Sequence, residues 1–462
     1  MKPSIPRGTR DFGPAEMQKR QFIFNILKTN FQLFGYAPIE TPSMENISTL
    51  TGKYGEEGDQ LIYKILNSRI HESKDEKKDE LKKEFNISLE KSYNSELLTE
   101  KALRYDLTVP FARYVVMNQH SITFPFKRYQ IQPVWRADKP QKGRYREFYQ
   151  CDADVIGSNS LTNELELIAM IDKSFHQLNI PVILKFNNRK ILSGIAEILN
   201  ASDKIIDITV AIDKLDKIGK EGVIKELKEK GISEIAINKL EPLIDLSGSN
   251  ENKVEVLTSF LLTSEIGKKG IEEINYLLQQ LNTINTKHIK LELDITLARG
   301  LNYYTGTIFE AKANAGTFTP SILGGGRYDD LTGIFGLKNM SGVGISFGVD
   351  RIYDVMEELN LFPESVNKIS TTKLLLTHFG IDEQQYCLSL TSKLREANIN
   401  CELYPDVVKI KKQFEYADKK QIPFVAVVGS NEIVNKTVML KNMQTGSQEE
   451  LSIEQLIQHL SN

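Results

Sequence analysis

The chain has 462 residues, of which 26% are charged and 40% hydrophobic, and its formal net charge is −3 at pH 7. This length predicts roughly two to four domains of an ordinary globular protein. The small net charge excludes a polycation, so any binding to nucleic acid must depend on local basic patches. No apolar run is long enough to span a bilayer, and the opening residues lack the apolar core of a signal peptide. We therefore expect a cytoplasmic protein without a membrane segment.

The first forty residues predict an arm, a helix and an edge strand. In the arm, Arg7 and Arg10 either pair with something central or remain solvated. Apolar residues recur at helical spacing over 16–34, and Gly35 follows as a C-cap. The segment 37–42 reads as a short edge strand, because each of its two prolines removes a donor from the ladder.

The next segments predict an exposed insertion and a second strand. Residues 67–101 have mixed charge and few apolar side chains, so we expect a solvent-facing, partly helical insertion. Over 103–109, LRYDLTV alternates, which predicts a strand with Asp106 and Thr108 on one face. The two side chains either receive an ammonium group or bond to each other.

The stretch 126–157 predicts two long antiparallel strands joined by the basic loop 137–144. The apolar face of the first strand should pack inward. The polar face carries an arginine, an aromatic ring, an amide and a carboxylate, namely Arg136, Phe148, Gln150 and Asp154. The arginine suits a phosphate, the aromatic ring suits a flat base, and the carboxylate suits a cationic group. An amphipathic hairpin with a solvated polar side fits the same pattern, and the pattern alone does not decide between them.

Beyond the hairpin, the sequence predicts a helical region and then further strands. Residues 161–178 read as a helix with Glu164 and Glu166 outward. A buried strand at 182–186 precedes short helical patterns that continue to about residue 285, which predicts a small helical domain. The strands expected at 291–297 and 307–311 flank Arg299, Tyr303 and Tyr304, and the run 324–326 reads as a tight glycine turn.

The last third predicts a nucleotide-binding segment and a separate small domain. Residues 342–351 read as a strand running into a helix, with Arg351 in the first turn, where it could reach a phosphate. After a linker at 360–372, strands alternate with helices, which predicts an α/β domain with a mainly parallel sheet. The three cysteines have no metal-ligand spacing, and we expect them to be reduced core residues: Cys151, Cys387 and Cys401.

Several of these segments resemble the motifs of class II aminoacyl-tRNA synthetases. FKRYQIQPVWR followed by GRYREFYQCDAD resembles motif 2 in the form of histidyl-tRNA synthetases, and LARGLNYYTGTIFE resembles a motif peculiar to that family. The first helix with its edge strand is similar to motif 1, and 342–351 to motif 3. One departure is Asn302, where many family members carry an aspartate.

The resemblance implies an α+β fold and a division of the chain. An antiparallel sheet flanked by helices would be built from 1–180 and 289–360. A helical insertion domain would occupy 181–288, and an anticodon-binding domain 373–462. Motif 1 implies a homodimer.

The resemblance also implies an activity: L-histidine would be activated by ATP with Mg²⁺, and the histidyl group transferred to tRNA(His). Magnesium would come with ATP, since no side-chain cluster for a metal is evident. The implied residues are Arg136, Arg299 and Arg351 for catalysis; Asp106, Thr108, Gln150, Asp154, Tyr303 and Tyr304 for histidine; Arg136, Phe148 and Arg351 for ATP; and Gln141, Lys142 and Arg144 for the tRNA acceptor stem.

A non-catalytic reading competes with this one. Synthetase-like paralogues can serve as histidine-sensing regulatory subunits of a biosynthetic enzyme, and such paralogues tend to lack the anticodon domain and part of the ATP-binding set. Because Arg136, Arg299, Arg351 and the C-terminal domain are all present here, the sequence favours the synthetase.

Overall fold

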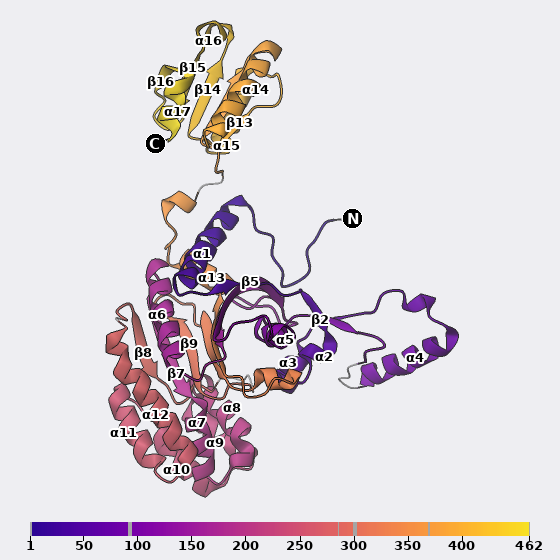
Figure 1. The fold of residues 1–462 in the computed structure, drawn as a ribbon, viewed down its shortest axis with the longest axis vertical. Coiled ribbons are helices and arrows are strands. Elements are labelled where there is room, and N and C mark those ends of the chain that lie inside the picture. Colours follow the sequence, from indigo (N-terminus) through magenta and orange to yellow (C-terminus); the bar gives the residue numbers. More distant parts are fainter. Residues whose placement is uncertain (1, 91–94, 285, 299–302, 368–369, 462) are drawn as a thin grey trace. The chain divides into compact units, whose positions relative to one another are not determined.

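The computed structural model describes residues 2–90, 95–284, 286–298, 303–367 and 370–461. It divides into two compact units (Figure 1), each considered by itself below. The larger unit comprises Met1–Asp11 and Arg20–Leu361, and the smaller Phe12–Lys19 and Phe362–Asn462. No helix in the described ranges is long and apolar enough to cross a membrane.

The larger unit is built on an eight-stranded sheet. In spatial order its strands are β1 (Ala37–Pro38), β5 (Phe126–Trp135), β6 (Glu147–Ile156), β11 (Gly342–Gly348), β10 (Leu323–Tyr328), β9 (Thr307–Ala313), β7 (Val182–Asn188) and β8 (Ile289–Leu293). The pairs at the two ends, β1 with β5 and β7 with β8, are parallel, and the strands between them pair antiparallel. The predicted antiparallel core and its edge strand are thereby confirmed.

The predicted hairpin is β5 and β6, and its two faces have different roles. One face packs on the helices α1 (Pro14–Leu33) and α13 (Val349–Glu358), and α6 (Thr162–Gln177) packs on the neighbouring strand β11. These three helices lie on the same side of the sheet in Figure 1. On that side Phe347 of β11 has its ring centroid 6.0 Å from that of Phe31 and 5.6 Å from that of Phe175. Every second side chain of β6, including those of Gln150 and Asp154, therefore points to the sheet face opposite the helices, as the period of two predicts.

The part of the polar face farther from the hairpin loop is buried, which excludes the reading of the whole face as a solvated surface, whereas Arg136, Phe148 and Gln150 nearer the loop are half-buried. Arg128 and Gln130 have 0% of their surface exposed, and Asp152 and Asp154 only 1% and 2%. Charged residues are rarely buried in this way unless they are paired. This part of the face therefore belongs to the interior of the unit.

The glycine run 324–326 is part of strand β10, so the predicted turn is wrong. A Cβ at Gly325 would overlap the carbonyl oxygen of Gly344 on the neighbouring strand β11. The glycines therefore serve the close approach of two strands, which a single-sequence reading cannot distinguish from a turn.

The segment 103–109 also differs from expectation. Strand β4 (Lys101–Leu103) ends early, and helix α5 (Thr108–Asn118) begins where the strand was expected to continue. The reason is local, since Asp106 Oδ1 accepts a hydrogen bond from the backbone N–H of Val109 at 3.1 Å and so satisfies a donor of the first turn.

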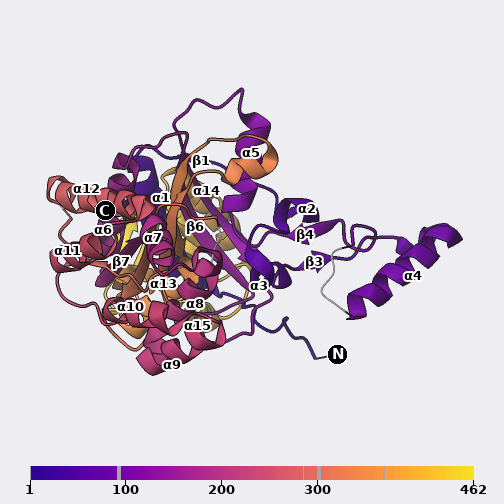
Figure 2. The ribbon, with the colours of Figure 1, turned by 90° about the horizontal axis from the view of Figure 1, so that it is seen from below.

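Strand β4 belongs to a small second sheet with β2 (Met44–Asn46) and β3 (Lys64–Ile65). The arm that carries η1 (Ile70–Glu72) and α4 (Asp75–Glu90) extends outward beyond it in Figures 1 and 2. The expected exposed and partly helical insertion is therefore confirmed. The short helices α2 (Ile47–Leu50) and α3 (Gly55–Gln60) lie between β2 and β3 in the sequence.

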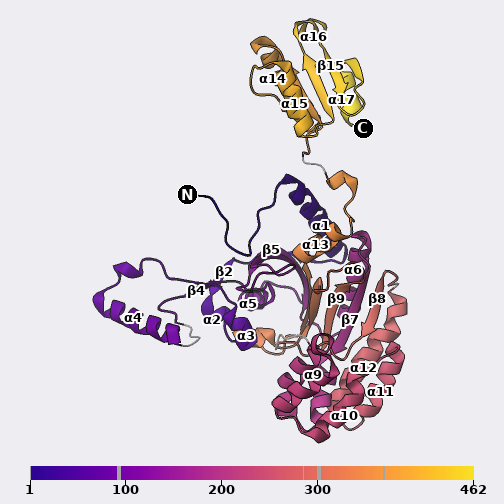
Figure 3. The ribbon, with the colours of Figure 1, turned by 180° about the vertical axis from the view of Figure 1, so that it is seen from behind.

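The predicted helical region is confirmed and lies beside β7 and β8 (Figure 3). It contains α7 (Arg189–Ile198), η2 (Ser202–Lys204), α8 (Ile205–Asp213), α9 (Leu215–Glu229), α10 (Glu234–Ile244), α11 (Asn250–Phe260), α12 (Glu265–Gln280) and η3 (Leu281–Thr283). Serine side chains cap α10, α11 and α12 at their N-termini. The expected domain 181–288 also contains β7, which is a strand of the main sheet.

The smaller unit has a five-stranded sheet in the order β13 (Cys401–Leu403), β12 (Leu374–His378), β14 (Phe424–Val428), β15 (Thr437–Asn442) and β16 (Gln448–Ser452). The described helices around it include α14 (Ile381–Glu396), α15 (Ile410–Lys419), α16 (Ser430–Asn435) and α17 (Ile453–Ser461). Only the pairs of β12 are parallel, so the sheet is mixed rather than mainly parallel. The hairpin β15–β16 was missed because β16 is largely exposed and polar. All three cysteines are buried and reduced, as expected.

Candidate active site

A pocket of about 400 Å³ lies on the sheet face opposite the helices of the larger unit. The residues predicted from the sequence that line it are Asp106, Thr108, Arg136, Arg144, Phe148, Gln150, Tyr303, Tyr304 and Arg351. They come from the start of α5, the β5–β6 hairpin, the segment before β9, and α13. The fold thus brings together groups that are separated by more than two hundred residues in the chain.

Arg136 is held in place at the floor of the pocket. Its Nε donates to the carbonyl oxygen of Tyr105 at 3.1 Å. Its guanidinium carbon lies 4.2 Å from the ring centroid of Tyr105 and 5.2 Å from that of Phe148. A guanidinium stacked in this way is preorganised to meet a phosphate edge-on.

Arg351 approaches the same pocket from the first turn of α13. Its Nε donates to the carbonyl oxygen of Gly143 at 2.7 Å, and its Nη1 to that of Ser321 at 2.7 Å. These bonds tie the helix to the hairpin loop. Arg299, the third predicted arginine, and Asn302 both lie outside the described residues.

Asp106 and Gln150 present buried acceptors to the pocket. Asp106 Oδ1 accepts from the Tyr54 hydroxyl at 2.9 Å, whereas Asp106 Oδ2 is buried without a hydrogen-bond partner among the described residues. Gln150 Nε2 donates to Ser346 Oγ at 2.8 Å, and within the same ranges Gln150 Oε1 likewise has no partner. Burial raises the pKa of Asp106. Unpaired buried acceptors are costly, so these two oxygens fit a cationic donor supplied by a ligand.

The two tyrosines of the segment before β9, Tyr303 and Tyr304, lie against each other and against α5. Their ring centroids are 4.8 Å apart, and the hydroxyl of Tyr303 is hydrogen-bonded to that of Thr108. Tyr303 and Tyr304 both line the pocket. The structure therefore places Thr108 beside Asp106, although on a helix rather than on the expected strand.

Asp154 does not line the pocket but lies below its floor. Its Oδ1 accepts from the hydroxyl of Tyr328 at 2.6 Å, and its Oδ2 is 2.7 Å from Arg128 Nη2. Gly344 faces it across the sheet, and a Cβ there would overlap the carboxylate. A ligand can contact Asp154 only by replacing part of this arrangement.

Sequence reasoning missed three of the residues that surround the predicted site. Arg128 shares its strand face with Arg136, so the period of two could have identified it. Tyr328 was hidden by the interpretation of the glycine run as a turn. Tyr54, which donates to Asp106, comes from a segment with no pattern that would single it out.

The predicted loop residues Gln141, Lys142 and Arg144 lie at the rim of the site and form mostly local contacts. Gln141 and Arg144 form a backbone bridge across the turn at Gly143, whose φ is +72°. Lys142 Nζ is 3.0 Å from Glu358, and Arg144 Nη1 is 3.6 Å from Asp138. The lysine side chain is 67% exposed and the arginine 49%, so both can reach solvent partners.

The N-terminal arm packs against the same region, which confirms that Arg10 pairs centrally. Arg10 forms an ion pair with Asp350, and its guanidinium carbon lies 3.5 Å from the ring centroid of Tyr145. Asp350 also forms an ion pair with Arg20, whose Nη1 lies 2.7 Å from Asp350 Oδ1. Its Oδ2 accepts a hydrogen bond from the backbone N–H of Tyr149 at 2.8 Å. This carboxylate thereby joins the arm, the first helix and the hairpin at the wall of the pocket.

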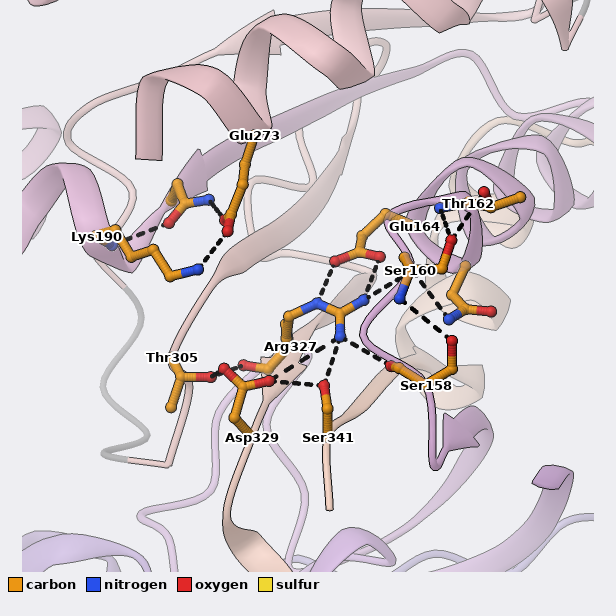
Figure 4. A network of polar contacts seen from close by, with 12 residues as sticks. Ser158, Ser160, Thr162, Glu164, Lys190, Glu273, Thr305, Arg327, Asp329 and Ser341 are labelled. Carbon is orange, nitrogen blue, oxygen red and sulfur yellow. Dashed lines mark hydrogen bonds and ion pairs between the residues drawn. The ribbon is translucent and has the colours of Figure 1, made fainter. Parts of the chain in front are cut away.

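A buried network behind the tyrosine segment centres on Arg327 (Figure 4). Its Nε and Nη2 each lie 2.6 Å from an oxygen of Glu164, so the expectation that Glu164 points outward is wrong. Only Glu166 is partly exposed, where it pairs with Lys127. Thr305 Oγ1 donates to Asp329 Oδ2 at 2.6 Å, and Thr305 N to Arg327 O at 2.8 Å. The network therefore anchors the residue that follows Tyr304.

Comparison with known proteins agrees with this architecture. The family model for histidyl-tRNA synthetase matches residues 94–352, and that for an anticodon binding domain matches residues 372–462. A histidine–tRNA ligase of Phocaeicola vulgatus is 58% identical over 99% of this chain and 98% of its own length. The crystal structure of a histidyl-tRNA synthetase from Nostoc sp. PCC 7120 has a TM-score of 0.80 at 28% identity, covering 100% of this chain and 99% of that one.

A third similar structure bears on the alternative interpretation of the chain as a regulatory subunit. An ATP phosphoribosyltransferase regulatory subunit/histidyl-tRNA synthetase structure from Bacillus halodurans has a TM-score of 0.70 at 20% identity, covering 93% of this chain and 99% of that one. At this identity the likeness concerns the fold alone.

The antiparallel sheet with arginines converging on its open face, joined to an anticodon-binding domain, defines a class II aminoacyl-tRNA synthetase. Both the family match over more than half of the chain and the full-length identity point to one member of that class. The chain belongs to the histidyl-tRNA synthetase family, the histidine–tRNA ligases.

Proposed function

We propose that the pocket on the sheet activates L-histidine with ATP and Mg²⁺, and that the histidyl group then passes to the 3′ end of tRNA(His). The observation that carries this proposal is the meeting of two guanidiniums, from Arg136 and Arg351, with the two unpaired acceptors Asp106 Oδ2 and Gln150 Oε1. The guanidiniums suit phosphate oxygens, and the acceptors suit the ammonium of an amino acid.

Each group then has a role in adenylate formation. Attack by the histidine carboxylate concentrates negative charge at the α-phosphate, so the reaction needs fixed cations and no nucleophilic side chain. Arg136 would hold the α-phosphate, and Arg299 would approach it from the opposite side. Arg351 would bind the γ-phosphate and lie against the adenine, whose other face would stack on Phe148. Asp154 and Tyr304 would read the imidazole nitrogens.

Magnesium would enter with ATP. Among the residues that the structure describes, no group of three or more histidine, cysteine or carboxylate side chains could hold a metal ion. The triphosphate would therefore supply most of the ligands of Mg²⁺, as is usual for this ion. The ion would add to the positive charge that Arg136 places near the α-phosphate.

Histidine-dependent exchange of pyrophosphate into ATP tests the whole proposal. A synthetase incorporates labelled pyrophosphate only when histidine is present, because adenylate formation is reversible. A regulatory paralogue binds histidine without exchange. Absence of exchange in a folded preparation that binds histidine would favour the regulatory reading.

Substitution of Asp154 by asparagine should raise the KM for histidine by about 10- to 100-fold, because a hydrogen bond to a charged group is lost. The KM for ATP should change little, since the carboxylate lies below the histidine end of the pocket. Exchange kinetics with either substrate varied measure both values. An equal rise in the two KM values would remove Asp154 from histidine recognition.

For the tRNA we propose contacts between the acceptor stem and Gln141, Lys142 and Arg144. Lys142→Ala should reduce the slope of log Kd against log salt concentration by about 1, since one phosphate contact is lost. Lys290 of β8, which is 67% exposed and lies at the other end of the sheet from β1, offers a matched control, whose alanine variant should keep the slope of the unmodified protein. A salt-independent affinity of the unmodified protein would contradict this role of the loop.

We further propose that the protein acts in the cytoplasm as a homodimer through α1 and β1, and that the smaller unit binds the anticodon. Sedimentation equilibrium should give twice the chain mass of 52.5 kDa. A monomer at micromolar concentration with full exchange activity would overturn the dimer.

A further inference from the structure

Below the floor of the pocket, two buried carboxylates face a single guanidinium. Asp152 and Asp154 lie two residues apart on β6 and therefore on one face, opposite Gln130 and Arg128 of β5. Arg128 Nη2 is 2.7 Å from Asp154 Oδ2 and 4.0 Å from Asp152 Oδ2. The side chains of all three charged residues are at most 3% exposed.

The hydrogen bonds of this cluster are incomplete. In the described part of the chain, Asp152 Oδ1, Arg128 Nε and Nη1, and Gln130 Oε1 are buried without partners. The guanidinium instead packs on the ring of Phe111, 4.3 Å from its centroid. One cation therefore faces two carboxylates, and ionisation of both would leave a net negative charge in the interior, which is costly.

The surroundings favour a proton on Asp152. Burial raises the pKa of Asp152 to about 7, with Arg128 opposing the rise and Asp154 adding to it. Burial also raises the pKa of Asp154, which Arg128 and the hydroxyl of Tyr328 oppose. Because Asp154 has both the nearer guanidinium contact and the tyrosine donor, Asp152 is the carboxyl group of the pair that more readily holds a proton.

Two further charged groups act on Asp152 from the neighbouring elements. Asp106, at the start of α5, adds negative charge and raises the pKa of Asp152. Arg104, which follows β4, interacts electrostatically with Asp152 from the other direction. Asp106 is itself an anion, and the guanidinium of Arg104 donates to the carbonyl oxygens of Pro133 and Thr41. Arg128 is therefore the cation in contact with the pair, and the balance within the cluster remains one cation to two carboxylates.

The cluster is connected to the pocket through one hydroxyl. Ser346 of β11 lies opposite Asp152 in the sheet, and its hydroxyl is hydrogen-bonded to that carboxylate. The same hydroxyl accepts from Gln150 Nε2 at 2.8 Å, and both Gln150 and Ser346 line the pocket. A cation that binds to Gln150 and Asp106 therefore lies close enough to act on Asp152.

We propose that Asp152 and Asp154 share one proton in the unliganded protein and that binding of the ammonium group of L-histidine expels this proton to the solvent. Asp152 is then a positioning residue for the amino acid, and it makes histidine affinity increase with pH through the neutral range. The inference rests on the proposed histidine site. The proton leaves an Asp152 oxygen for the buffer, and the ammonium group of the substrate replaces its positive charge.

Calorimetric titration with L-histidine in two buffers of different ionisation enthalpy measures the protons released. The unmodified protein should release a substantial fraction of a proton per histidine at about pH 7. Asp152→Asn removes the exchangeable proton and should release almost none. Binding by the unmodified protein without proton release would overturn the proposal whether or not any variant folds.

The pH dependence of the histidine KM gives an independent readout. The ratio of the Asp152→Asn value to that of the unmodified protein should rise between about pH 6 and about pH 8, by about tenfold for each pKa unit by which binding shifts the pair. Free histidine titrates in the same way in both measurements, so its own pH dependence cancels in this ratio. A ratio that stays constant with pH would overturn the proposal.

A control and a second variant separate the possible failures. Asp172 is a buried carboxylate of α6 that accepts from the backbone N–H groups of His288 and Ile289, away from the pocket, and Asp172→Asn should retain the proton release. If Asp154→Asn leaves the histidine KM unchanged, the proposed histidine site fails. If Asp154→Asn raises this KM but Asp152→Asn releases as many protons as the unmodified protein, only the shared proton fails.

Discussion

Replacement of Arg136 by alanine should lower kcat for histidine-dependent pyrophosphate exchange by about 10²- to 10³-fold, which is the loss seen when one preorganised donor to developing negative charge is removed. The guanidinium is positioned by the carbonyl of Tyr105 and by the rings of Tyr105 and Phe148 before any substrate arrives. Its interaction with the α-phosphate strengthens as charge develops there, so the loss should fall on kcat more than on the KM for ATP.

Two further variants make this test specific. Arg136→Lys keeps the charge but loses the planar, stacked fork, and should recover only a small part of the rate. Arg395 is an exposed arginine of α14 in the other unit, and Arg395→Ala should leave exchange unchanged. Near wild-type kcat for Arg136→Ala, with an unaltered circular dichroism spectrum, would exclude Arg136 from the chemistry.

The largest expected loss of stability follows from breaking the ion pair between Arg327 and Glu164. Arg327→Ala should lower the free energy of unfolding by about 3–5 kcal/mol, because the carboxylate of Glu164, which has no exposed surface, would remain buried without its partner. Arg327 also donates to Ser341 Oγ at 2.6 Å and to the carbonyls of Ser158 and Ser160 (Figure 4), so its removal leaves several acceptors unpaired.

Urea denaturation followed by circular dichroism measures this loss. The double variant Arg327→Met with Glu164→Leu should recover much of it, since an apolar pair leaves no buried charge. The exposed pair of Lys225 and Glu229 offers a control, and Lys225→Ala should leave the transition midpoint unchanged. An unaltered midpoint for Arg327→Ala would show that the network contributes nothing to the stability of the unit.

Much of the candidate site could be predicted from alternation along single strands. The period of two placed Phe148, Gln150, Asp152 and Asp154 on one face of β6, and the structure agrees. This succeeds because strand geometry is a local property of the backbone, independent of which strand becomes the neighbour. The resemblance to known motifs added the expectation that these residues lie near Arg351. Alternation within one strand cannot supply that expectation.

Two of the errors arose where a distant segment decides the local structure. The glycine run of β10 is a strand because β9 and β11 lie on either side of it. Glu164 points inward because Arg327, 163 residues away in sequence, arrives beside it. Neither partner is visible in the sequence around these residues.

The sequence by itself determined most of the helices and strands, the two faces of the hairpin and the family, because periodicity, turn residues and motifs are read within short stretches. Only the tertiary structure decided that part of the polar face is buried, that Asp154 lies below the pocket with Arg128 and Tyr328, and that Asp152 and Asp154 share one counterion. These properties depend on which strands lie side by side, and burial and charge balance are set by neighbours that the local sequence does not contain.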